Sequence, residues 1–357
     1  MSEELRLDGL TKRYGGNVAL DGVTLAVPAN TYISVLGPSG SGKTVLLRVI
    51  AGFEQPDAGE ARFAGERIDR MPAHRRGIGF VFQNFALFPH LSVRDNIAFG
   101  LRHRDVAPLA DSGALHGKVD AIIELVGLGG LAERGVHQIS GGQRQRVALA
   151  RTLVTEPRLV LLDEPLGALD ANLRARMRAE LRQIRERLGV TFLHVTGSES
   201  EALAMGDRVI VLDRGRVGQF DEPDAVYTQP ASPNVARFLN CYNIFTGHLD
   251  GGRFVAPGGA FLLPDARRAA PEPAYCIRQD LIDIRPSDAA MQPGETGLVG
   301  RFVTSEYSGA SVQYFFEVEG GRAVEVEAHL SHRRPEDLEP RRPYTLAWHA
   351  DHALVFG

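Results

Sequence analysis

Cysteine is scarce in this 357-residue sequence: only Cys241 and Cys276 occur, and their separation does not match a metal-binding pattern. So few thiols exclude a small scaffold held by disulfides and indicate a reducing compartment. We therefore expect both thiols to be free and buried.

Long apolar runs are also missing. No stretch approaches the roughly 18 uninterrupted apolar residues of a membrane-spanning helix. The N-terminus carries the acidic residues Glu3 and Glu4 where a secretory signal needs basic residues followed by an apolar run. We expect a cytoplasmic chain.

The sequence also lacks a large excess of positive charge: its net charge is −4, which does not favour nucleic acid as the main partner. The hydrophobic fraction of 44% is ordinary for a soluble globular protein. Because 357 residues exceed one typical hydrophobic core, two domains are expected.

The strongest motif present is Gly37–Thr44, which fits the phosphate-loop pattern G-x-x-x-x-G-K-[ST]. Residues 32–36 read as a strand before it and residues 44–50 as a helix after it. Backbone N–H groups of such a loop surround phosphate oxygens at the positive end of the helix. Lys43 then reaches the β- and γ-phosphates, and Thr44 offers its hydroxyl to Mg²⁺. An ordinary Gly/Ser turn is the alternative, and the strand–loop–helix context argues against it.

Two further residues, Tyr14 and Gln83, are candidates for functional roles only because of the motifs around them. Tyr14 lies on a loop ahead of the phosphate loop, where its ring either stacks on a nucleotide base or simply packs. Gln83 ends the strand predicted over residues 78–82, where a neutral amide either orients water or a metal ion or caps the strand.

A second predicted anion site begins at Ser140, where Gly141 and Gly142 open a helix. Ser92 is predicted to cap another helix, with a helical pattern continuing to about residue 136. The apolar loop at residues 85–88 between these features is either core or a surface for a partner.

Two carboxylates follow a continuous apolar run, residues 159–162, that is typical of a parallel strand buried on both faces. Asp163 and Glu164 thus lie at the carboxyl end of a strand, where α/β proteins bind ligands. Asp163 can hold Mg²⁺ through water, and Glu164 can accept a proton from an attacking water. The helix predicted to follow carries a face of arginines that we interpret as solvated.

Taken in order, these motifs resemble the ATP-binding subunits of ABC transporters, and the resemblance covers essentially the whole chain. The matches are Tyr14 for the adenine-stacking aromatic, Gly37–Thr44 for Walker A, Gln83 for the Q-loop, Ile139–Gln143 for the signature with Ile for the usual Leu, Leu159–Asp163 for Walker B, Glu164 for the catalytic glutamate, and Ala168–Asp170 for the D-loop.

The resemblance implies ATP and Mg²⁺ as cofactors and assigns site residues. Catalysis is expected from Glu164, Gln83 and Lys43, and metal binding from Thr44, Gln83 and Asp163. Nucleotide contacts are expected from Tyr14, Ser39, Gly40, Ser41, Gly42, Lys43, Thr44, Val45, Gln83, Ser140, Gly141, Gly142, Gln143 and Asp170.

The resemblance also implies partners. Two copies, or one copy and another ABC ATPase, enclose two ATP molecules head to tail, so that Ser140, Gly142 and Gln143 grip the γ-phosphate on the partner's loop. Two membrane permease subunits, and indirectly an external solute-binding protein, complete the assembly at the cytoplasmic face of the inner membrane. The loop at residues 85–88 then becomes the coupling surface, and no nucleic acid is expected.

One expected residue is absent. Gly197 occupies the position of the family's switch histidine, which contacts the γ-phosphate. His194 is three residues away, about 10 Å along a strand and on its opposite face, so it does not substitute. We expect normal ATP binding with slow hydrolysis, unless groups such as Ser198 organise the site.

The last third of the chain reads differently. Alternation of Val312, Tyr314, Phe316 and Val318 predicts antiparallel strands with one solvated face. This region resembles a TOBE-type barrel related to OB folds, with Trp348 in its core. Residues 277–280 fit that family's Ile-Arg-Pro-Glu-like turn loosely, because Gln279 replaces proline. Whether the barrel binds a regulator or joins the dimer stays open.

We therefore predict an α/β P-loop ABC ATPase domain over residues 1–240, with a helical subdomain at about 84–155, and an all-β OB-like TOBE domain over 241–357. The predicted function is ATP hydrolysis that powers import of an unidentified solute, in a group resembling polyamine and iron(III) uptake. A weakly hydrolysing regulatory subunit is one alternative. A non-transport ABC protein acting on nucleic acid or ribosomes is another, although the tandem ATPase domains or coiled-coil insertion that would support it are absent.

Overall fold

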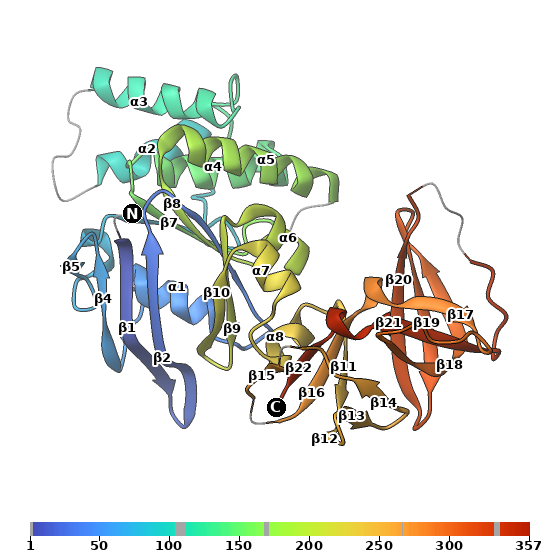
Figure 1. The fold of residues 1–357 in the computed structure, drawn as a ribbon. Helices are drawn as coiled ribbons and strands as arrows, with labels where there is room; N and C mark the ends of the chain where they lie inside the picture. Colours follow the sequence, from blue (N-terminus) through green and yellow to red (C-terminus); the bar gives the residue numbers. More distant parts are fainter. Residues whose placement is uncertain (1–2, 104–111, 168–170, 266, 271, 332–335) are drawn as a thin grey trace. The chain divides into compact units, whose positions relative to one another are not determined.

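The computed structural model describes residues 3–103, 112–167, 171–265, 267–270, 272–331 and 336–357 (Figure 1). The chain divides into two compact units, Met1–Val226 and Tyr227–Gly357. Residues 227–240 belong to the second unit by their contacts, and the functional boundary near residue 240 stays a prediction. In the described part of the chain, no helix is both long and apolar enough to cross a membrane.

The first unit contains two sheets. The strand order is β2-β1-β4-β5 in an antiparallel sheet and β10-β9-β3-β8-β7-β6 in a second sheet that is parallel except at β10. The strands are β1 (Glu3–Tyr14), β2 (Asn17–Pro28), β3 (Tyr32–Leu36), β4 (Ala58–Phe63), β5 (Glu66–Arg67), β6 (Ile78–Val81), β7 (Leu159–Asp163), β8 (Thr191–Val195), β9 (Arg208–Asp213) and β10 (Arg216–Asp221).

The helices of this unit cover both faces of the parallel sheet (Figure 1). They are α1 (Lys43–Ala51), α2 (Val93–Arg102), α3 (Ser112–Leu125), α4 (Gly141–Leu153), α5 (Ala171–Leu188) and α6 (Glu199–Met205), while α7 (Pro223–Thr228) reaches the unit boundary. Short 3₁₀ turns occur at Ala73–Arg75 and Val136–Gln138.

Strand β7 shows why the parallel sheet is apolar on both faces. Leu159 and Leu161 pack into the core shared with α1 and the antiparallel sheet, while Val160 and Leu162 pack against α2–α5. All five residues of β7 are buried, as the apolar run predicts. The strand therefore delivers Asp163 to the edge of the sheet between two packed layers.

Helix α1 is fixed at its C-terminal end by a buried arginine. Arg76 donates through Nη1 to the carbonyls of Val49 and Ile50, at 2.8 Å each, and through Nε to the carbonyl of Met71 at 2.8 Å. Only 4% of Arg76 is exposed, and burial lowers its pKa. These bonds supply donors to carbonyls of the last turn of α1, where intrahelical partners run out, and the Val49 carbonyl also accepts from the Gly52 N–H at 3.2 Å.

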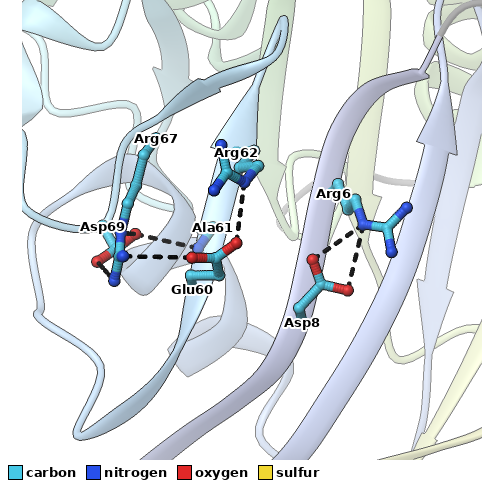
Figure 2. A network of polar contacts seen from close by, with 7 residues as sticks. All are labelled: Arg6, Asp8, Glu60, Ala61, Arg62, Arg67 and Asp69. Carbon is cyan, nitrogen blue, oxygen red and sulfur yellow. Dashed lines mark hydrogen bonds and ion pairs between the residues drawn. The ribbon is translucent and has the colours of Figure 1, made fainter.

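The antiparallel sheet carries ion pairs on β1 and β4 and at β5 (Figure 2). Arg67 donates to Asp69 through Nε at 2.9 Å and Nη2 at 3.0 Å, and Asp69 also accepts from the Ala61 N–H at 3.2 Å. Burial raises the pKa of Asp69, but the hydrogen bonds from Arg67 and Ala61 outweigh it, so the pKa is lowered. Asp69 thus fastens β4 to the segment after β5.

The helical layer differs in part from the sequence prediction. Ser92 caps α2, accepting from the Asp95 N–H, as predicted. The helical pattern expected to reach residue 136 instead stops at Leu125, because Gly127 turns the chain in the left-handed region with φ +66°. Phe85 and Leu87 are half-buried against this layer and contribute to the core, while the coupling surface expected at residues 85–88 stays a prediction.

The second unit is dominated by three antiparallel or mixed sheets, ordered β11-β16-β22-β15, β12-β13-β14 and β17-β21-β18-β19-β20. Its strands are β11 (Tyr242–Thr246), β12 (His248–Asp250), β13 (Arg253–Ala256), β14 (Gly259–Leu262), β15 (Arg267–Arg268), β16 (Ala274–Arg278), β17 (Asp283–Pro286), β18 (Glu295–Tyr307), β19 (Ser311–Val318), β20 (Arg322–His329), β21 (Pro343–His349) and β22 (Leu354–Phe356). Helix α8 (Pro233–Phe238) and 3₁₀ turns at Gln279–Leu281 and Ala350–His352 complete it.

Aromatic side chains fill the core of the second unit. Trp348 is 2% exposed, and its Nε1–H donates to the Tyr275 hydroxyl at 2.9 Å, which confirms its predicted core position. The alternating residues of β19 face the same core. Neither cysteine forms a disulfide, as predicted, but only Cys276 is buried; Cys241 is partly exposed.

Candidate nucleotide-binding site

The candidate site lies where the parallel strands β3, β6, β7 and β8 end. Their carboxyl ends lead into the phosphate loop, Gln83, Glu164 and Gly197 respectively. In open α/β sheets, ligands bind in the crevice outside these strand ends. The fold thus gathers motifs that are up to 160 residues apart in the sequence (from 37 to 197).

The phosphate loop is packed tightly at two glycines. Gly42 has φ +99°, and a Cβ there would lie 2.3 Å from the Ala19 carbonyl oxygen. A Cβ at Gly37 would lie 2.2 Å from the Leu212 carbonyl oxygen. Any larger side chain would push the loop off its support, so the loop's shape depends on these two positions.

Lys43 is buried behind the loop, with 8% of it exposed. Its Nζ donates to the Gly37 carbonyl at 2.7 Å and to the Pro38 carbonyl at 3.0 Å. Burial lowers its pKa, and the nearby Glu164 and Asp163 carboxylates oppose that shift. A cation held by carbonyls inside a concave loop fits a phosphate group.

Ser41 supplies a second indication of an anion. Its side chain is 3% exposed, and its Oγ has no hydrogen-bond partner among the described residues. A buried hydroxyl without a partner costs about 1–3 kcal/mol. A phosphate oxygen would accept from it. Ser39 and Gly40 are exposed at the mouth of the loop, and Val45 is half-buried on α1.

Thr44 and Asp163 bring the phosphate loop and β7 together. Thr44 Oγ1 donates to Asp163 Oδ1 at 3.1 Å. Asp163 is 8% exposed, and burial raises its pKa. The hydrogen bond from Thr44 and the charges of Arg48 and Lys43 lower the pKa in part, but the net shift is upward. One hydroxyl and one carboxylate fit Mg²⁺, which keeps several waters, and the described residues contain no cluster of three or more His, Cys, Asp or Glu that would form a fuller cage.

Glu164 adjoins this pair and is held in an unusual backbone conformation. Its φ is +45°, a left-handed conformation that costs a non-glycine residue roughly 1–2 kcal/mol. Its N–H donates to the Val195 carbonyl at 3.0 Å, and its carboxylate accepts from Gln83 Nε2 at 3.0 Å. Backbone strain at the end of a buried strand is characteristic of functional residues.

Tyr14 is not a packing residue, since 46% of it is exposed. Its hydroxyl contacts the Glu54 carboxylate, and Lys12 Nζ lies 5.4 Å from its ring centroid. The exposed ring is available for stacking, which stays a prediction.

The signature residues form a capped helix terminus. Ser140 Oγ accepts from the Gln143 N–H at 3.3 Å, and the Ser140 N–H donates to Gln143 Oε1 at 2.8 Å. This reciprocal capping box leaves Ser140 exposed. Gly141 is half-buried. Gly142 packs so closely that a Cβ would lie 2.8 Å from Leu173.

Gly197 lies on an exposed loop between β8 and α6. A Cβ added there would meet no heavy atom within 4 Å. His194 is fully buried on β8, on the side of Tyr32, which agrees with the expectation that it does not replace the switch histidine. Asp170, predicted to contact nucleotide, lies outside the described residues.

Sequence reasoning missed one residue that shapes the loop after Gln83. Arg151 on α4 donates to the carbonyls of Phe85 at 2.9 Å and Ala86 at 2.7 Å. Phe85 and Ala86 have left-handed φ values of +64° and +46°. Arg151 therefore connects the helix that begins with the signature to the loop that begins with Gln83. A single arginine in an amphipathic helix gives no sequence signal of this role.

Comparison with known proteins agrees with these motifs. A family model described as ABC transporter matches residues 20–167, and one described as TOBE domain matches residues 282–356. The chain is 39% identical over 361 residues to a spermidine/putrescine import ATP-binding protein of Rubrobacter xylanophilus, covering 99% of this chain and 93% of the relative. It is 42% identical over 347 residues to a sulfate/thiosulfate import ATP-binding protein of Ralstonia nicotianae, covering 94% and 91%.

Solved structures are similar as well. The dimeric structure of an ATP-binding cassette in a post-hydrolysis state with ADP and phosphate superposes with a TM-score of 0.55 at 30% identity, covering 61% of this chain and 98% of that one. Motifs, fold and full-length similarity agree, and the chain belongs to the family of ABC transporter ATP-binding proteins, as an ATPase subunit.

Proposed function

We propose that this chain binds MgATP and hydrolyses it to drive solute import through a membrane permease. The proposal is carried by the juxtaposition of two hydrogen bonds: Thr44 to Asp163 at 3.1 Å, and Gln83 to Glu164 at 3.0 Å. These two bonds, beside one phosphate loop, support a metal-binding role for Thr44 and Asp163 and a role as general base for Glu164. Similar chains named as import ATP-binding proteins support the direction of transport.

The residues act in separate roles. Lys43, the Ser41 hydroxyl and the N–H groups opening α1 bind the β- and γ-phosphates. Thr44 and Asp163 hold Mg²⁺, which neutralises charge on the phosphate oxygens when bound. Glu164 accepts the proton of the attacking water, and Gln83 orients that carboxylate.

Hydrolysis is tested with Glu164→Gln in the purified full-length chain. We expect ATP turnover to fall by about a hundredfold or more while ATP still binds, because the amide cannot accept the proton. Glu186→Gln, the same change at an exposed position of α5, is the matched control. Equal turnover in the two variants would remove Glu164 from catalysis.

We further propose that two copies assemble head to tail, with Ser140–Gln143 of each chain completing the site on its partner. The exposed helix terminus at Ser140 supports this, because the positive end of a helix attracts anions. The similar solved cassette is described as dimeric. A heterodimer with another ABC ATPase would use the same surfaces.

Mixing two inactive variants distinguishes a shared site from a site within one chain. Lys43→Ala disables the phosphate loop, and Ser140→Arg disables the signature. In a head-to-tail dimer, the mixed pair contains one site with both parts intact, so mixing should restore turnover. A mixture as inactive as its components would contradict the shared site.

Gly197 favours a second candidate, a subunit that binds ATP but hydrolyses it slowly. No imidazole is present at this position to hold the γ-phosphate, and the space around Gly197 admits one. Gly197→His should raise turnover at saturating ATP without tightening ATP binding. Unchanged turnover would show that other groups, such as Ser198, already organise the site.

We propose that two permease subunits dock beside Gln83, at the cytoplasmic face of the inner membrane, with an external solute-binding protein acting through them. Phe53 and Phe82 are 48% and 37% exposed there and stack at 5.6 Å. Phe53→Ser should abolish stimulation of turnover by permease in vesicles while basal turnover persists. If basal turnover is lost as well, Phe53 is needed for the stability of the fold rather than for docking of the permease.

The cargo is proposed to be chosen by the permease and binding protein. Relatives of about equal identity, 39% and 42%, are named for a polyamine cation and for an oxyanion. We also propose that residues 1–240 act as the ATPase domain, with a helical subdomain at about 84–155, and residues 241–357 as the TOBE-like domain.

A further inference from the structure

Three polar side chains with no part in ATP binding meet inside the first unit. Tyr32 of β3, His194 of β8 and Glu201 of α6 are 1%, 0% and 4% exposed. Tyr32 Oη and His194 Nδ1 are hydrogen-bonded at 3.0 Å, and His194 Nε2 lies 2.9 Å from Glu201 Oε1. We call these three residues the buried polar chain.

The protonation state of Tyr32 follows from its surroundings. Burial, and then the Glu201 carboxylate, raise the pKa of Tyr32 well above its usual value, so its hydroxyl stays protonated. Besides His194 Nδ1, this hydroxyl contacts Met205 Sδ at 3.8 Å. A proton on the other ring nitrogen, Nε2, would leave Nδ1 to accept from Tyr32, and Nε2 faces Glu201. That contact is short without the geometry of a hydrogen bond, so it acts as an electrostatic attraction.

The position of Glu201 is unexpected from the local sequence. Ser198-Glu199-Ser200-Glu201 matches the capping-box pattern, in which the glutamate reaches back to the N–H of the cap residue. Here Ser198 does cap α6, but its own N–H donates to Thr196 Oγ1 at 3.0 Å. Glu201 instead enters the interior, where burying a carboxylate costs several kcal/mol unless it finds a partner.

The buried polar chain borders the elements that carry the site. His194 is paired with Ser34 on β3, which leads into the phosphate loop, and with Leu162 on β7, which leads to Asp163. The next residue, Val195, accepts the hydrogen bond from the Glu164 N–H. The residue after that, Thr196, donates its N–H to the Val35 carbonyl at 3.1 Å.

We propose that the buried polar chain positions Glu164 for catalysis. By tying α6 to β8 and β3, it fixes the end of β8, and the Val195 carbonyl there holds Glu164 in its left-handed conformation. Tyr32, His194 and Glu201 are thus positioning residues for hydrolysis, acting through the backbone. The inference rests on the proposed role of Glu164.

The decisive variant is His194→Phe, which keeps the ring volume and removes both nitrogens. We expect kcat for ATP to fall about tenfold or more, because small displacements of a catalytic group are costly, while ATP affinity changes less than about twofold. His194→Gln retains an amide able to meet Tyr32 and Glu201 and should recover most of the loss. Thr191→Val removes a partly buried hydrogen bond, from the Asn30 N–H, at the other end of β8 and is the matched control with kcat unchanged.

A double variant tests whether the effect passes through Glu164. In a Glu164→Gln background, His194→Phe should lower the residual turnover little further, because coupled residues are not additive. A full additional tenfold loss would overturn the proposal, as would a lower melting temperature with kcat unchanged per ATP-binding site. If His194→Phe does not fold, Glu201→Gln decides: at least a threefold fall in kcat is expected, and no fall overturns the proposal.

The two proposals fail in different ways. If Glu164→Gln itself leaves wild-type turnover intact, the proposed function of Glu164 is wrong. If Glu164→Gln behaves as expected and the His194 and Glu201 variants keep wild-type kcat, only the positioning role is wrong.

Discussion

The two units of this protein treat polar groups in their interiors differently. In the first unit, Ser41 Oγ is buried without a partner, and Glu164 is held in the left-handed region. In the second unit, Gln279, Gln313 and Glu325 bond to one another: Gln279 Nε2 donates to Glu325 at 3.0 Å, and Gln313 Nε2 donates to Gln279 Oε1 at 2.8 Å. Within the described residues, every buried side-chain nitrogen or oxygen that lacks a hydrogen-bond partner lies in the first unit.

This difference separates a site from a scaffold. Strain and unpaired polar atoms cost free energy, so they persist where a ligand or a reaction uses them. A network whose polar groups bond to one another, as around Gln279, stabilises one specific packing and leaves no polar group available to a ligand. The single tryptophan lies in the second unit, so Trp348 fluorescence reports on that unit alone.

The largest effect is expected from Gly42→Ala. The new Cβ would lie 2.3 Å from the Ala19 carbonyl oxygen at a backbone φ of +99°, so the phosphate loop must move. ATP binding should weaken by about a hundredfold or more, since an oriented cradle of donors is lost. Trp348 emission should not change. Gly117→Ala, where a Cβ meets nothing within 4 Å, is the control. A shift in Trp348 emission would show that the two units are not independent.

An intermediate effect, confined to the second unit, is expected from Tyr275→Phe. Trp348 Nε1–H would then be buried without its acceptor, at a cost of about 1–3 kcal/mol. The urea midpoint followed by Trp348 fluorescence should fall, with ATP turnover unchanged. Tyr307→Phe, at a position 69% exposed, serves as the control and should leave the midpoint in place. A change in turnover would contradict the separation of site from scaffold.

The smallest effect is a pH dependence at Arg285. Its guanidinium bonds Glu295 twice, at 2.8 Å each, and lowers the pKa of Glu295 from 4.5 to about 2. A lowered carboxyl pKa stabilises the fold above the unfolded pKa, and this stabilisation is lost as the pH falls through the folded value. The stability difference between wild type and Arg285→Ala should therefore be present at pH 7 and shrink between about pH 4.5 and pH 2.

The measurement for Arg285 is the urea midpoint of the second unit at a series of pH values. Arg342→Ala breaks an exposed pair with Glu339 and should give no pH-dependent difference. A constant difference for Arg285→Ala across the range would mean that its packing, rather than its charge, stabilises the unit.

Much of the first unit could be predicted because its motifs are local. Residues 32–36, 44–50 and 159–162 each reveal a strand or a helix from apolar pattern alone, and the structure confirms them as parts of β3, α1 and β7. The proximity of Thr44 to Asp163 also follows, because parallel strands end at one edge of a sheet.

What the sequence could not reveal is mostly tertiary. Arg151, Arg76 and the Val195 carbonyl act across 66, 27 and 31 residues (151 to 85, 76 to 49, 195 to 164), so no window of sequence contains both partners. Glu201 was hidden for a different reason: its local pattern predicts a capping box, and tertiary contact with His194 overrides it. Gln279 likewise stands where the expected turn has a proline, and its amide is explained by tertiary contacts to Asn240, Glu325 and Gln313.

Arg76 affects the electrostatic potential at the phosphate loop from the opposite end of α1. A helix behaves as two opposite partial charges, and the carbonyls of Val49 and Ile50 are the negative one. The Arg76 guanidinium neutralises the partial negative charge at the C-terminus of α1. The partial positive charge at the N-terminus, near Lys43 and about 13 Å away, is then no longer opposed by it. Through a buried path that salt screens poorly, the segment between β5 and β6 therefore contributes to the electrostatic potential felt by an anion it never contacts.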